Sequence, residues 1–178
     1  MKHQSNNFSK RGLFSRVLSH LWFEVRGLAS VFNDPALRRI EKAVAASERE
    51  HSAELRIAIE SSMPLRVLWS GASPRARATD AFARHRIWDT ESNNGVLIYI
   101  CIADRAVEIV ADRGITAHLP KAYWENVCAV MVSGFAKGEF EQATIKAIEQ
   151  LESELIRLYP VTSGQANPNE LSNRPLIL

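Results

Sequence analysis

Four acidic residues of this chain have the chemistry to bind a divalent cation, and polar residues surround most of them. The four are Glu54, Asp89, Glu91 and Asp112. Calcium takes 6–8 oxygen ligands and accepts carboxylates, amides and backbone carbonyls alike. Magnesium needs fewer protein ligands and suits phosphate chemistry. These residue types predict a divalent-metal site, provided that the fold brings them together.

Neutral and basic groups near these acids extend the same hypothesis. Asn93 and Asn94 offer neutral oxygen ligands, Trp88 can frame the loop that carries them, and Arg113 can hold an anionic group. A simpler interpretation stays open. Arg113 and Arg56 would then neutralise the acids in surface ion pairs, each of which contributes little stability.

The elements that must position these residues are three strands. Residues 53–59 alternate apolar and polar side chains, 96–103 are continuously apolar, and 107–111 return after a turn at Asp104-Arg105. A helix at about 74–86 joins the first two strands, so we expect them to be parallel. The hairpin turn predicts Asp112 opposite Leu97, and it gathers the acids at one end of the sheet.

Helices account for much of the remaining chain. Asp34 is the expected cap of a helix that starts with Pro35 and extends to about Arg49, and two further helices follow the third strand. The predicted fold class is α/β, with a small mixed β-sheet packed against helices as an α-β-α sandwich. We divide the chain into a basic amphipathic segment (1–33), one domain (34–160) and a disordered tail (161–178), which is rich in Pro, Asn, Ser and Gly.

The N-terminal segment is basic and amphipathic. Apolar side chains recur at helical spacing through 10–32, and residues 1–33 carry five basic side chains against Glu24, a net charge of +4. Such a helix can lie on an anionic membrane surface, or it can pack on the domain or on a second copy. We expect no secretory signal and no membrane span, and therefore a cytoplasmic protein, with peripheral contact at the inner membrane face as one possibility.

Composition and motifs limit the other function classes. The whole chain has a net charge of only +2, which does not predict a nucleic-acid partner. Cys101 and Cys128 lie in apolar contexts without metal-site spacing, so we expect both to be reduced core residues. No Cys-x5-Arg loop, no DxDx-type nucleophile motif and no histidine pair at ligand spacing is present. A hydrolase would therefore have to use the carboxylate cluster alone.

Several segments, taken in order over about 125 residues, resemble the TPM domain, which is named for thylakoid lumen, photosystem II repair and receptor-modulator proteins. The matching stretches are IEKAV (40–44) leading to Glu48, HSAELR (51–56), NGVLIY (94–99), ADR (103–105), VEIVADRGI (107–115) and 135–138. The loop WDTESNN (88–94) is similar to that of a soluble bacterial branch. One departure is Ala53, where the family usually has glycine.

The resemblance implies a fold and a range of activities. Family members have been proposed as weak phosphatases, calcium binders and assembly or repair factors, and bacterial members are often encoded beside LemA-type membrane proteins. We therefore expect a binding or assembly module that depends on calcium or magnesium and acts with a membrane-associated partner of the LemA type. The alternative is a weak metal-dependent phosphatase that uses the same carboxylates.

Overall fold

A four-stranded mixed sheet lies at the centre of the protein, whose structure, a computed structural model, describes residues 12–161 and 169–178. The strand order is β3-β2-β1-β4, with β1 parallel to both β2 and β4 and β3 antiparallel to β2. The strands are β1 (Glu54–Glu60), β2 (Gly95–Cys101), β3 (Ala106–Ala111) and β4 (Leu176–Ile177). The predicted parallel pair and the predicted hairpin are confirmed.

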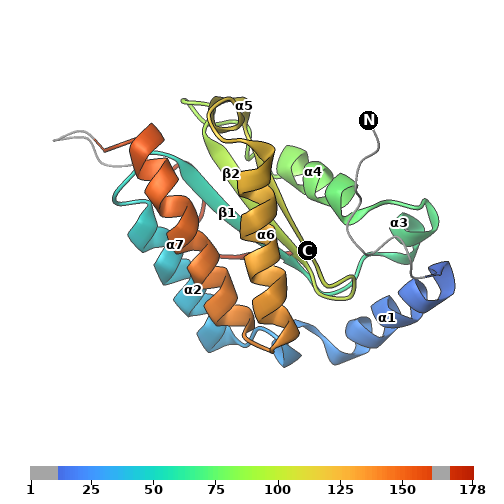
Figure 1. The fold of residues 1–178 in the computed structure, drawn as a ribbon. Coiled ribbons are helices and arrows are strands. Elements are labelled where there is room, and N and C mark those ends of the chain that lie inside the picture. The colour runs from blue at the N-terminus through green and yellow to red at the C-terminus, as the bar shows by residue number, and fades with distance from the viewer. Residues whose placement is uncertain (1–11, 162–168) are drawn as a thin grey trace.

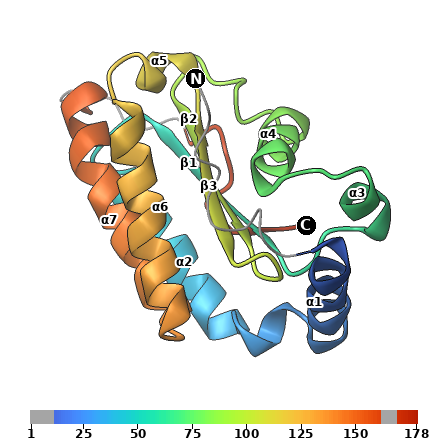
Figure 2. The same ribbon diagram turned by 45° about the vertical axis from the view of Figure 1, so that its right-hand side comes forward.

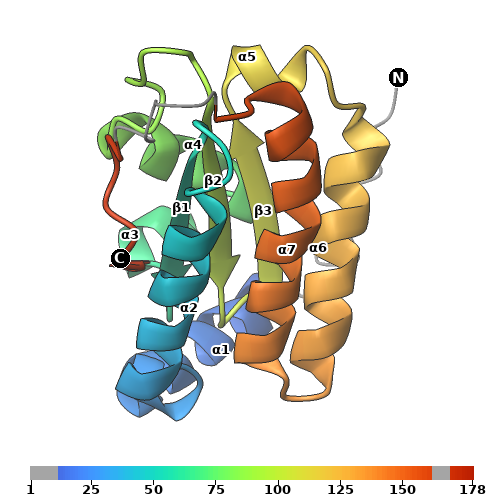
Figure 3. The same cartoon turned by 90° about the vertical axis from the view of Figure 1, so that its left-hand side faces the viewer.

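Helices cover both faces of this sheet, so the α-β-α sandwich is confirmed (Figures 1 and 3). The helices α2, α6 and α7 lie on one face, and α3 and α4 lie on the other (Figure 2). The helices are α1 (Leu13–Arg26), the 3-10 helix η2 (Leu28–Ser30), α2 (Asp34–Ser47), α3 (Leu65–Trp69), α4 (Pro74–Arg84), α5 (Arg113–Thr116), α6 (Lys121–Ala136) and α7 (Phe140–Leu158).

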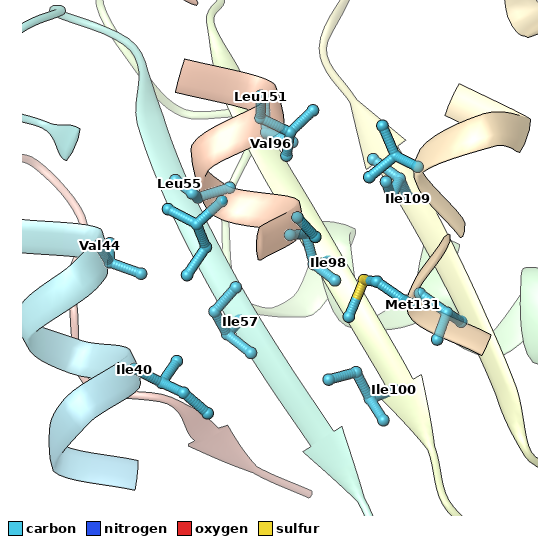
Figure 4. Close-up of a cluster of buried hydrophobic side chains, with 14 of the residues drawn as sticks. Ile40, Val44, Leu55, Ile57, Val96, Ile98, Ile100, Ile109, Met131 and Leu151 are labelled. Carbon is cyan, nitrogen blue, oxygen red and sulfur yellow. The ribbon is translucent and has the colours of Figure 1, made fainter. Parts of the chain in front are cut away.

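Branched apolar side chains on alternate positions of β1 and β2 form the larger core (Figure 4). Ile57 and Ile98 point into it from the strands, and Val44, Met131 and Leu151 fill it from α2, α6 and α7. All five are at most 1% exposed, and each such side chain contributes about 1.5–3 kcal/mol when buried. The second core, on the other face, includes Cys101. This thiol is free and buried, whereas Cys128 is free and half-buried.

Two details of the sequence prediction differ from the structure. The helix α2 is capped by Asn33, whose side chain accepts the amide hydrogen of Ala36 at 2.9 Å, and Asp34 is the first helical residue. The hairpin register is shifted by two residues, since Cys101 pairs with Ala106. The turn therefore has four residues rather than two, which moves Asp112 from the expected position opposite Leu97 to the level of Gly95.

The tail was predicted to be disordered over 161–178, and this prediction is wrong for 169–178. Residues 176–177 form β4 beside β1, and the amide of Leu178 donates to the carbonyl of Ile59 at 3.1 Å. Leu171, Leu176 and Leu178 pack against the second core. Apolar contacts of this kind provide the free energy that orders a segment of otherwise polar composition. Residues 162–168 lie outside the described part.

The amphipathic N-terminal segment forms α1 and η2, which are separated by Gly27 with φ of 69°. The first residues of the expected helix, 10–11, lie outside the described residues. Among the described helices, none has both the length and the apolar composition needed to cross a bilayer.

Candidate functional site

Three residues come level with one another at the end of the sheet where β1 and β2 begin. Glu54 pairs in register with Gly95, and the amide of Asp112 donates to the Gly95 carbonyl at 2.9 Å. Neighbouring strands are about 4.8 Å apart. Gly95 is required between them, because a Cβ there would lie 1.9 Å from the carbonyl oxygen of Ile87. The start of β2 therefore passes directly under the preceding loop.

Glu54 is completely buried at this end of the sheet. Its Oε2 accepts the amide hydrogen of Leu171, from the tail, at 2.9 Å. Its Oε1 has no hydrogen-bond partner among the described residues. Burial raises the pKa of this carboxyl above its ordinary value. The carboxylate expected to bind a metal thus keeps one oxygen free under the tail.

Asn94 and Asp112 each also have one buried side-chain oxygen that accepts no hydrogen bond from the described residues. The Asn94 amide nitrogen Nδ2 donates to the Ser52 carbonyl at 2.8 Å, while Oδ1 has no donor in the described chain. Asp112 caps α5, because its Oδ1 accepts the amide hydrogen of Arg113 at 2.6 Å, and its Oδ2 has no donor either. Buried polar oxygens without partners are uncommon and call for an explanation.

The other predicted ligands lie on the exposed loop that precedes β2. Asp89 is half exposed and lies 3.3 Å from Arg86. Glu91 is exposed, and its backbone amide is 3.2 Å from a carboxylate oxygen of Glu170 in the tail. Trp88 is 48% exposed and donates its indole hydrogen to the Ala83 carbonyl. The structure therefore brings Glu54 and Asp112 to the sheet end and leaves Asp89 and Glu91 at the rim.

Asn93 and Arg113, predicted as ligand-binding residues, are in direct contact. The guanidinium Nη2 of Arg113 donates to Asn93 Oδ1 at 3.0 Å, and the amide of Gly114 donates to the Asn93 carbonyl at 3.1 Å. A Cβ on Gly114 would lie 2.5 Å from that carbonyl and 2.7 Å from the Tyr159 hydroxyl. The loop is thus fastened to α5, and Arg113 remains exposed beside it.

Glu48 belongs to this end of the sheet, although the sequence analysis did not include it among the ligands. Its Oε1 accepts the amide hydrogen of Leu55 at 2.8 Å, and its buried Oε2 has no partner among the described residues. Burial raises the pKa of this carboxyl to about 8. The sequence signal that could have identified Glu48 is its place between the end of a predicted helix and the start of a buried strand.

A second polar cluster lies at the opposite end of the sheet. Within the described ranges, one group of three possible metal ligands has all its atoms within 4.8 Å, and it comprises His20, Cys101 and Asp104. Both Asp104 oxygens already accept from the guanidinium of Arg16, at 2.9 and 2.7 Å. His20 Nδ1 accepts the amide hydrogen of Met63 at 2.8 Å, and burial raises the pKa of the Cys101 thiol to about 12. A cation there would compete with an arginine, so this cluster holds α1 in place.

In the described part of the chain, none of the predicted ligands belongs to a group of three within that distance, so a cation at the Glu54 end would have to draw side chains together. The groups suit such a role, since two carboxylates and an amide oxygen are hard ligands and the loop can add backbone carbonyls. Glu54, Asn94 and Asp112 are therefore the residues that could hold an ion. Asp89 and Glu91 could join them only if the loop moved.

Comparisons with known proteins identify the family. The model of the TPM domain matches residues 25–154. Among solved structures, the chain is similar to the NMR structure of the BA42 protein from the psychrophilic bacterium Bizionia argentinensis. The identity is 23% and the TM-score 0.74, with 86% of this chain and 99% of that chain covered. No curated protein matches the chain. The match to the family model covers well over half of the sequence, so the chain belongs to the TPM-domain family.

Proposed function

We propose that the protein is a binding module that takes up a divalent cation, preferably calcium, at the end of the sheet where β1 and β2 begin. In that state it would bind a membrane-associated protein partner, of the LemA type that the family resemblance implies, at the cytoplasmic face of the membrane. The observation that supports this proposal is the set of buried oxygens on Glu54, Asn94 and Asp112 that have no donor in the described part of the chain. A hard cation would satisfy all three if these side chains moved together around it.

Proton release is a property that this proposal requires. Burial raises the pKa of Glu54, so this carboxyl holds its proton more tightly than an exposed glutamate does. A cation binds the deprotonated form and must displace that proton. Ion binding should therefore strengthen as the pH rises through the raised pKa of Glu54.

Thermal unfolding of the full chain in calcium, magnesium, manganese or EDTA tests the proposal. A ligand that binds only the folded state stabilises it by about 2.7 kcal/mol at one hundred times its dissociation constant. For a chain of this size, that free energy corresponds to a rise in Tm of roughly 5–10 °C. We expect this rise with calcium in the unmodified protein.

Matched variants locate the effect. Asp112→Asn and Glu54→Gln should abolish the ion-dependent rise, whereas Glu149→Gln, which removes an exposed carboxylate from α7, should retain it. Circular dichroism in EDTA establishes that each variant is folded. The same Tm in EDTA and in every ion at millimolar concentration would refute the cation-dependent module.

Weak metal-dependent phosphatase chemistry at the same carboxylates is the second candidate. Arg113 is the observation that favours it, because its exposed guanidinium lies against Asn93 and follows Asp112 in the chain, and a guanidinium can bind phosphate oxygens. Hydrolysis of a phosphate monoester that requires the stabilising ion and falls at least tenfold in both Asp112→Asn and Arg113→Met would favour the enzyme over the module. Ion-dependent stabilisation without hydrolysis would favour the module.

A further inference from the structure

The helix α1 attaches to the domain through its polar face. The guanidinium of Arg16 binds both oxygens of Asp104, and the hydroxyl of Ser19 donates to the Ala103 carbonyl at 2.8 Å. His20 is 1% exposed and accepts the amide hydrogen of Met63. These contacts fix the rotation of α1 about its own axis, because they lie three and four residues apart on one side of it.

The apolar face of α1 consequently points away from the domain. Its exposed side chains are Phe14 at 78%, Leu18 at 51%, Leu21 at 45%, Trp22 at 60% and Val25 at 88%. A surface helix of a globular protein ordinarily does the reverse and buries its apolar stripe in the core. An apolar stripe held outward by buried polar contacts points to a surface that something else covers.

A second helix extends this surface. Leu65 and Trp69 of α3 are exposed by 43% and 70%, and Leu65 lines the same pocket as Leu21 of α1. We call the five exposed side chains of α1, together with Leu65 and Trp69, the α1–α3 patch. It contains seven of the eleven large apolar side chains that are exposed in the described chain. The helices α1 and α3, which carry the patch, lie at one corner of the molecule, away from α5 (Figures 1 and 2).

The charges around the α1–α3 patch indicate what covers it. The guanidinium of Arg26 lies 5.4 Å from the centre of the Trp22 ring, and Arg66 is exposed between Leu65 and Trp69. Glu24, the acidic residue of α1, instead accepts a hydrogen bond from Ser62 of the domain. Tryptophan beside arginine on an apolar surface is typical of the membrane–water interface.

We propose that the α1–α3 patch binds the surface of an anionic membrane, with α1 lying in the plane of the interface. Trp22, Trp69 and the aliphatic side chains would enter the level of the headgroups, while Arg26 and Arg66 meet lipid phosphates. Each basic side chain near an anionic surface contributes attraction that salt weakens. The proposal is independent of the cation site, since it uses none of its residues.

Co-sedimentation of the full chain with lipid vesicles tests this inference. We expect binding to vesicles of phosphatidylcholine and phosphatidylglycerol at 3:1, and at least tenfold weaker binding to phosphatidylcholine alone. Adding 0.5 M NaCl should also weaken binding to the anionic vesicles. The double substitution Leu18→Ser and Trp22→Ser should reduce the partition coefficient at least tenfold, and Arg26→Glu should reduce binding only to anionic vesicles.

Ile156→Ser is the matched control, because Ile156 is an exposed apolar side chain of α7 and lies outside the patch. It should bind vesicles as the unmodified protein does. The substituted α1 side chains are exposed, so these variants should keep the unmodified Tm, which establishes that they fold. Absence of binding to anionic vesicles would overturn the proposal. So would a dimer in solution that the Leu18 and Trp22 substitutions dissociate, since the patch would then bind a second copy.

Discussion

At the scale of single residues, the carboxylate of Glu48 forms a hydrogen bond with the edge of a β-strand. Its Oε1 accepts the amide hydrogen of Leu55, which points away from β2 at the edge of β1. The side chain thus takes the place of a missing strand partner, which an edge amide otherwise lacks. Its second oxygen is buried and has no partner among the described residues, and burial raises the pKa of this carboxyl despite the bond from Leu55.

Glu48→Gln should change how stability depends on pH. The pKa of Glu48 is raised from 4.5 to about 8, so the folded chain holds a proton between these values that the unfolded chain releases. Stability is therefore lost as the pH rises through this window, by at most about 1.4 kcal/mol per pH unit. Glutamine can keep the bond to Leu55 but does not titrate. Urea unfolding at pH 5, 6.5 and 8 should show a smaller decline in the variant.

His51 allows the sign of this effect to be checked in the same data. Burial lowers its pKa from 6.5 to about 4, so its contribution to stability grows as the pH rises between these values. In the unmodified chain this rise offsets the decline due to Glu48 below pH 6.5. The rise should become visible in Glu48→Gln. If the free energy of unfolding varied with pH in the same way in Glu48→Gln and in the unmodified protein, the assignment to Glu48 would be contradicted. The control Glu149→Gln should show the same pH dependence as the unmodified protein.

Several site residues could be predicted from sequence because local pattern determines where they lie. Glu54 begins a strand and Asp112 follows one, so the topology alone brings both to the same end of the sheet. The buried state of Glu54 could not be predicted, because it depends on Leu171, which is 117 positions away. Asp89 and Glu91 lie on a loop, where sequence pattern does not determine the direction of a side chain.

At the scale of elements, β4 is the feature that sequence pattern could not identify. It has two residues, too few for an alternation to be recognised, and it follows a polar segment typical of disorder. The helices α3 and α5, of five and four residues, were missed for the same reason. The long helices and the three longer strands were predicted correctly, since the helices and β1 repeat an apolar period and β2 is a continuous apolar run.

Leu176→Ser and Ile177→Ser form a matched pair that tests the packing of β4. Leu176 packs against the second core, whereas Ile177 is 49% exposed. The first substitution should lower stability by roughly 1–2 kcal/mol, because it removes apolar contacts from a partly buried position. The second should stay within about 0.5 kcal/mol of the unmodified protein. Urea unfolding measures the free energy of unfolding of both variants. Equal losses of stability would show that side-chain packing does not determine how β4 stabilises the protein.

At the scale of the whole molecule, the two candidate surfaces lie at opposite ends of the sheet. Glu54 begins β1 and Glu60 ends it, and α1 is anchored beyond Glu60, at Asp104 and Met63. A strand of seven residues spans roughly 20 Å. If both proposals hold, a molecule resting on the membrane through α1 and α3 would present the Glu54 end away from the lipid, where a protein partner could reach it.

Substitutions at the two ends should act independently, because the sites share no residue and lie farther apart than the roughly 7–10 Å over which neighbours couple. The Leu18 and Trp22 double variant should keep the calcium-dependent rise in Tm, and Asp112→Asn should keep its binding to anionic vesicles. Thermal unfolding and co-sedimentation of each variant check this. A loss of both properties in either variant would show that the ends are coupled.

The pairing of β4 with β1 also has a consequence for synthesis on the ribosome. The carboxylate of Glu48 protects the start of the β1 edge early, because it lies only seven residues from Leu55. The remainder of that edge, at Ala58 and Ile59, has to wait until residues 176–178 emerge. An open edge in a nascent chain can pair with the edge of a neighbouring chain. We therefore expect the interval between the emergence of β1 and of β4 to be the period in which this protein most needs a chaperone.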